Sequence, residues 1–201
     1  NGKIQEHANF LAVEVNNGAI PIATNSVVAA MGIASIIVGQ YYMTKINTEL
    51  KMINDGISQI QNFLDNEYKS KVFSLITYIK KIIDFQTEIL ENDELRLSEI
   101  LQLDRLEEKC TELLGQAHLT LIDLTKKVEL DYKMYEKTLE TVNNWFIYQK
   151  ILMNVMYKIS DLRYILHFGN ISRKQCSNLL LTYAKQDSEV QVRLKIWHKD
   201  I

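Results

Sequence analysis

The histidine and cysteine side chains of this chain, which could bind a metal or move a proton, are few and far apart. Its histidines are His7, His118, His167 and His198, and its cysteines are Cys110 and Cys176. A metal or catalytic site needs such groups at short, regular spacing or beside a partner carboxylate, and the histidines have neither in the sequence. We therefore expect no catalytic residue, no metal site and no cofactor, and interpret the histidines as surface or satisfied core residues.

One segment carries three polar side chains close together, namely Asp161, Arg163 and His167. Asp161 and Arg163 are two positions apart, so they do not face each other on a helix. Glycine-rich phosphate-binding loops, His-Glu-x-x-His and Cys-x-x-Cys are all absent from the sequence. These observations predict a protein that is not an enzyme by itself.

Both cysteines fall at apolar positions of helical patterns. We interpret them as buried free thiols rather than as a disulfide or a metal site. Free thiols favour a reducing compartment, so the expected location is cytoplasmic or membrane-associated. Secretion stays open.

The composition places the chain among folded proteins without a strong charge bias. Hydrophobic residues make up 47% and charged residues 24%, which excludes intrinsic disorder. Lys and Arg number 23 against 25 acidic residues, for a net charge of −2. This balance predicts that the chain does not bind nucleic acid.

The chemistry-bearing residues all lie on segments with helical periodicity. Apolar residues recur at spacings of three and four from Ser70 to Leu90, from Leu97 to Val128, from Tyr132 to Leu166 and from Cys176 to Trp197. We find no alternation typical of a strand. The predicted fold is all-α: an elongated antiparallel bundle of about five helices, forming one domain over residues 1–201.

Local signals predict where some of these helices begin and end. Asn92 or Asp93 can cap a helix start. Ser172 and Gln175 have the spacing of a capping box, with Ser172 at the N-cap. Gly169 is predicted to follow the preceding helix as its C′ glycine.

Aromatic and methionine side chains form a band on the segment that ends at Leu166. Such bands line pockets or partner grooves, although they are more often part of a core. The residues of the band are Trp145, Phe146, Tyr148, Met153, Met156, Tyr157 and Tyr164.

The most apolar part of the chain runs from Val15 to Thr44, thirty residues without a charge between Glu14 and Lys45. Residues 1–18 are only weakly patterned, residues 19–43 form the apolar segment, and residues 44–201 are amphipathic. Small side chains recur in the apolar segment and allow close helix packing. Two tyrosines follow them near the end of the segment, and tyrosines are typical of a membrane interface. These candidate helix-packing or membrane residues are Ala29, Gly32, Ile36, Gly39, Tyr41 and Tyr42.

The same spacing continues beyond the apolar segment as a coiled-coil-like seam. One long central helix from about residue 26 to residue 64 is predicted to carry it. The seam residues are Met43, Ile46, Leu50, Ile53, Ile57, Ile60 and Leu64.

Two functions fit this pattern. In the first, the chain is a helical interaction or scaffold protein that delivers or shields the apolar segment, and it binds a protein partner or a second copy through helix faces. In the second, residues 22–43 enter a lipid bilayer as an insertion segment or an anchor. An apolar helix joined to a long helical bundle resembles, in architecture, the α-helical pore-forming toxins, and the remaining sequence is similar in texture to bacterial helical proteins. The resemblance implies a membrane-inserting role.

Overall fold

The computed structural model describes residues 66–126 and 131–200. The described residues form six helices and no strand, which confirms the all-α prediction. The helices are α2 (Asn66–Asp84), α3 (Gln86–Glu91), α4 (Asp93–Leu124), α5 (Tyr132–Leu166), α6 (Arg173–Cys176) and α7 (Asn178–Asp200). The long helix predicted for residues 26–64 lies outside the described residues.

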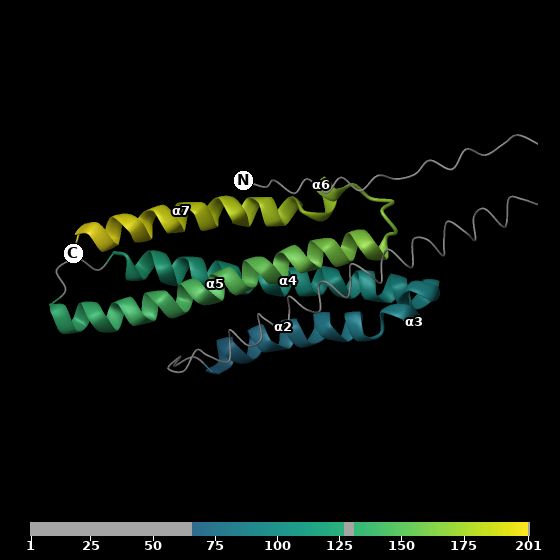
Figure 1. Cartoon of the computed structure of the whole chain (residues 1–201), viewed down its shortest axis with the longest axis horizontal. Helices are drawn as coiled ribbons and strands as arrows, with labels where there is room; N and C mark the ends of the chain where they lie inside the picture. Colours follow the sequence, from purple (N-terminus) through teal and green to yellow (C-terminus); the bar gives the residue numbers. More distant parts are fainter. Residues whose placement is uncertain (1–65, 127–130, 201) are drawn as a thin grey trace, which may run out of the picture.

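Helices α4 and α5 form the centre of the bundle because their contact is the most extensive among the described elements. Figure 1 shows α2 and α7 on opposite sides of this pair, with the four long helices roughly aligned along the long axis. The bundle is therefore elongated, as the sequence predicts.

Two contacts between α2 and α4 show in which direction these helices run relative to each other. The Tyr68 hydroxyl near the start of α2 donates to the Leu113 carbonyl in the C-terminal half of α4, at 2.9 Å. At the other end of α2, Lys81 lies 3.6 Å from Glu99 in the second turn of α4. The two helices are consequently antiparallel. Short connections impose the same relation on α4 with α5 and on α5 with α7.

The core is a continuous apolar cluster to which all four long helices contribute. Its centre holds side chains such as Val72, Leu103, Leu121 and Leu152, which are fully buried. Tyr68 packs edge-on against Trp145 and Tyr148, with ring centroids 4.7 and 5.3 Å away. These three aromatic side chains anchor α2 to α5.

Two helix starts follow the predicted capping. The Asn92 side chain accepts hydrogen bonds from the backbone N–H groups of Glu94 and Leu95, at 3.0 and 3.1 Å. The Ser172 hydroxyl accepts from the Gln175 backbone N–H at 3.1 Å. Each interaction satisfies donors that a helix start otherwise leaves unpaired.

The end of α5 differs by one residue from the prediction. Phe168, not Gly169, occupies the first position after the cap, with a φ of 51°. Gly169 follows with a φ of 73°, and its N–H donates to the Tyr164 carbonyl at 3.0 Å. This is a Schellman motif. Arg96 of α4 covers the Phe168 ring at 4.3 Å, and this tertiary contact holds a bulky residue in a backbone conformation that favours glycine.

Two predicted helices are interrupted. The segment predicted as continuous from Ser70 to Leu90 breaks at Phe85, between α2 and α3, and the last helix breaks at Ser177, between α6 and α7. Some residues of the predicted apolar faces are exposed, among them Leu97, Tyr132, Leu139 and Leu179. At these positions no described neighbouring helix covers the side chain.

Candidate functional site

The residues that sequence reasoning selected as sites lie outside the described residues. This holds for the candidate packing or membrane positions from Ala29 to Tyr42 and for the seam from Met43 to Leu64. Both assignments stay predictions. The described residues offer other candidate surfaces.

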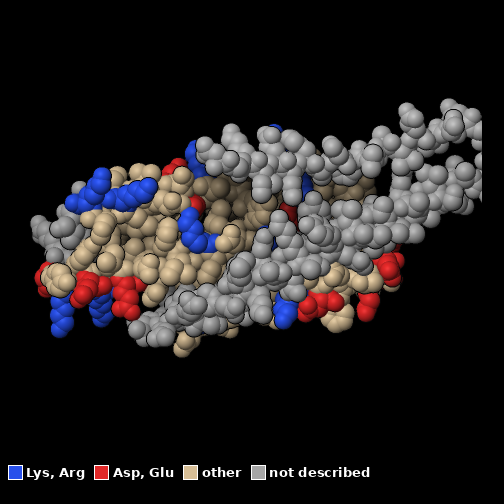
Figure 2. All heavy atoms as spheres, in the orientation of Figure 1, with Lys and Arg blue, Asp and Glu red and all other residues tan. Residues whose placement is uncertain are grey.

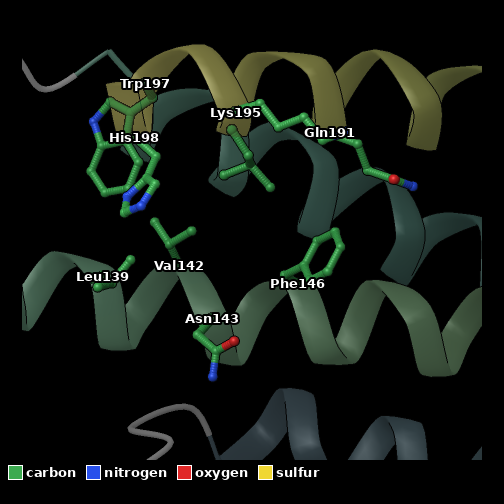
Figure 3. A pocket seen from close by; sticks show the side chains of 9 residues that line it. Leu139, Val142, Asn143, Phe146, Gln191, Lys195, Trp197 and His198 are labelled. Atoms are coloured by element: carbon green, nitrogen blue, oxygen red, sulfur yellow. The ribbon is translucent and has the colours of Figure 1, made fainter. Parts of the chain in front are cut away.

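A groove lies between α5 and the C-terminal half of α7, with a volume of about 330 Å³. Figure 3 shows side chains from both helices reaching into it, with Val142 and Phe146 directed from α5 toward α7 and Trp197 directed from α7 toward α5. The described residues lining it are Leu139, Val142, Asn143, Phe146, Gln191, Leu194, Lys195, Trp197 and His198. An open, apolar groove with a few polar groups is the usual form of a ligand or partner site.

An aromatic cluster closes one end of this groove. The Tyr135 hydroxyl and His198 Nδ1 are 2.7 Å apart, a hydrogen-bond distance. The Tyr135 ring also lies 5.8 Å from the ring of Trp197, which is buried. These contacts fix the orientation of the aromatic side chains before anything binds.

The aromatic and methionine band on α5 divides between core and groove. Trp145, Tyr148 and Met156 are buried in the core, whereas Phe146 lines the groove and Tyr157 is exposed. Part of the band therefore belongs to the core, and another part lines a groove.

A largely buried ionic cluster lies on the other half of the bundle. Arg163 of α5 binds both carboxylate oxygens of Glu107 of α4, at 3.0 and 2.7 Å, and also binds Asp104 at 2.9 Å. Arg163 and Ser160 both donate to the Cys176 carbonyl at the end of α6. Burial alone would lower the pKa of Arg163, but the hydrogen bonds that it donates to Glu107 and then Asp104, with the attraction of these carboxylates, outweigh burial and raise it. The cluster ties α4, α5 and α6 together.

A second polar group joins α4, α5 and α7. Asp187 of α7 is nearly buried and accepts from Lys150 at 2.8 Å and from Gln191 at 2.7 Å. His118 of α4 lies 3.1 Å from Gln186 of α7, and burial lowers the pKa of its imidazole. Sequence reasoning missed Asp187. Its position on the buried face of α7, between Tyr183 and Val190, was the available signal.

Both cysteines are buried free thiols, in agreement with the sequence interpretation. Burial raises the pKa of Cys110, and the nearby charge of Glu107 adds to this effect. Burial also raises the pKa of Cys176. Both side chains consequently remain protonated and poorly nucleophilic at neutral pH.

Asp161, Arg163 and His167 do not form a joint polar site. Asp161 pairs with Arg173 at 2.6 Å, whereas Arg163 faces Glu107. His167 is the C-cap residue of α5. In the described part of the chain, no group of three or more His, Cys, Asp or Glu side chains is placed to hold a metal ion.

The outer face of α4 exposes several leucines. Leu97 and Leu101 are one turn apart and are 60% and 65% exposed, and Leu119 is 67% exposed. Leu119 lies about five helical turns beyond Leu101 and therefore points in the same direction. These side chains form what we call the α4 leucine face.

Charged side chains of both signs lie on the molecular face shown in Figure 2. Basic side chains gather over the C-terminal part of α7 at the upper left, and both signs alternate along the lower left edge. Among the helices of residues 66–126 and 131–200, none combines the length and the hydropathy needed to cross a bilayer. Comparison with protein-family models, with curated proteins and with solved structures finds no match to this chain.

Proposed function

We propose that this chain is a non-enzymatic helical scaffold that assembles through helix faces, and that it delivers or shields its apolar segment Ile22–Met43. The supporting observation is the α4 leucine face, whose three leucines are each at least 60% exposed. Exposed apolar side chains that share one helix face, and that no described helix covers, are typical of an interaction surface. A second copy of the chain is the partner that we assign to this face.

The paired substitution Leu97→Lys with Leu101→Lys tests this assignment. Both side chains are exposed, so the variant should keep the melting temperature of the wild type. Sedimentation velocity over a rising concentration series should show self-association of the wild type and a monomeric variant. Leu181→Lys, at an equally exposed leucine of α7, serves as the matched control and should associate like the wild type.

Two results would contradict the scaffold proposal. In the first, the wild type remains monomeric at every concentration at which it is soluble. In the second, the paired variant associates as strongly as the wild type, which would place any interface elsewhere.

A second candidate function is membrane insertion by residues 22–43, supported by the thirty uncharged residues from Val15 to Thr44. Liposome flotation of the full chain tests it, beside a variant that lacks residues 1–43. Flotation that disappears only in the shortened variant supports insertion. A full chain that never floats with lipid removes this candidate.

A further inference from the structure

The groove between α5 and α7 has the chemistry of a small-ligand site. Its floor consists of apolar side chains from both helices, with Val142 and Trp197 almost fully buried. Phe146 and Leu194 are partly buried and extend this floor. Its volume of about 330 Å³ is at the lower end of the range for ligand pockets, so it suits a short chain or a single ring.

The ionisable side chains that line the groove are basic. Of the described residues that line it, Lys195 and His198 are basic and none carries a carboxylate. At the Phe146 end, Lys150 already pairs with Asp187, so that charge is compensated. Lys195 forms no ion pair with any described residue. No described carboxylate therefore competes with an external anion for its ammonium group at the edge of the apolar surface.

The groove is also organised in advance. The hydrogen bond between Tyr135 and His198 and the ring contact between Tyr135 and Trp197 hold one wall in place. A ligand then binds without the entropic cost of ordering these aromatic side chains.

We propose that this groove binds an amphiphilic carboxylate, with its aliphatic chain against Val142, Leu194 and Trp197 and its carboxylate on Lys195. A charge-assisted hydrogen bond from an ammonium group favours a carboxylate over a neutral head group. The apolar lining favours a chain over a small hydrophilic anion. This site is separate from the α4 leucine face, so either proposal can fail without the other.

Calorimetric titration of the full chain with decanoate, below its micelle concentration, tests the site. We expect saturable binding of one molecule per chain, accompanied by a change in tryptophan fluorescence, because Trp197 lines the groove. Decanol and decylammonium have the same chain with a neutral and a positive head group, and both should bind at least about tenfold more weakly than decanoate.

Lys195→Gln should weaken decanoate binding by about tenfold and leave decanol binding unchanged. Lys199→Gln removes the same charge from the same helix at a position outside the groove lining, and it should bind decanoate like the wild type. Neither lysine is buried, so both variants should keep the wild-type melting temperature.

Several outcomes overturn the proposal. Decanol or decylammonium that binds as tightly as decanoate would show that the charge of Lys195 does not select the ligand. Equal decanoate affinity in the wild type and Lys195→Gln would show the same, and so would absence of saturable binding. A shift of tryptophan emission with protein concentration alone, lost in a Trp197→Phe variant, would show that a second copy of the chain fills the groove.

Discussion

Removal of Glu107 should destabilise the bundle far more than removal of Asp104, although both carboxylates bind Arg163. The Glu107 and Arg163 side chains are 11% and 12% exposed, whereas Asp104 is 62% exposed. Glu107→Ala leaves a guanidinium in a mostly buried position, with the exposed carboxylate of Asp104 and the Cys176 carbonyl as its remaining partners. Loss of one member of a buried pair typically costs about 3–5 kcal/mol, and since Asp104 remains we expect about 3 kcal/mol.

Asp104→Ala removes only an exposed ion pair, for which about 0–1 kcal/mol is typical. The two variants form a matched pair because both delete a carboxylate that touches the same guanidinium. Urea unfolding followed by circular dichroism would give the free energy of unfolding of each variant. Added salt should reduce the small Asp104 effect and leave most of the Glu107 effect, because water and ions screen exposed charges more strongly.

A double variant separates two contributions to the free energy of unfolding: the attraction between Glu107 and Arg163, and the penalty of leaving one buried charge without its partner. Replacing both Glu107 and Arg163 with apolar side chains, as in Glu107→Leu with Arg163→Met, removes the unpaired charge as well as the attraction. We expect this variant to be more stable than Glu107→Ala. If Glu107→Ala loses no more stability than Asp104→Ala, the argument from burial is wrong.

Three further predictions concern single positions. Gly115→Ala should raise the free energy of unfolding by about 0.5–1 kcal/mol, because a Cβ there meets nothing within 4 Å and alanine is the better helix former. An unchanged or lower free energy in urea unfolding would contradict the open space beside Gly115. Tyr68→Phe should cost about 1 kcal/mol, since it removes the buried hydrogen bond to Leu113, and the same unfolding measurement checks it. Burial lowers the pKa of His118 below the ordinary value of 6.5, so the folded state binds fewer protons there than the unfolded state. The stability contributed by its neutral form is therefore complete above about pH 6.5, and it is lost as the pH falls from that value toward the lower pKa of the folded state. His118→Gln should flatten this part of the curve of unfolding free energy against pH.

Some features followed from the sequence alone because they depend on nearby residues. The helix starts at Asn92 and Ser172 are of this kind, since a short polar side chain can cap only the backbone that follows it. Periodicity likewise identified the helical segments, because residues three and four apart lie on one face whatever surrounds them. The burial of Cys110 and Cys176 followed from the same pattern.

Other features were decided by the packing of helices. Leu139 lies three positions before the buried Val142 on the same helix, yet it is exposed, because periodicity does not say where a neighbouring helix ends. Asp187 enters the interior because Lys150, on another helix, compensates its charge.

The sequence by itself determined that this chain forms amphipathic helices, where several of them begin, and that its cysteines are buried. Only the tertiary structure decided which apolar side chains stay uncovered on α4 and where α5 and α7 leave a groove. The physical reason is distance along the chain. Helix formation and capping depend on residues within about one turn, whereas the groove and the ion pairs join residues on different helices.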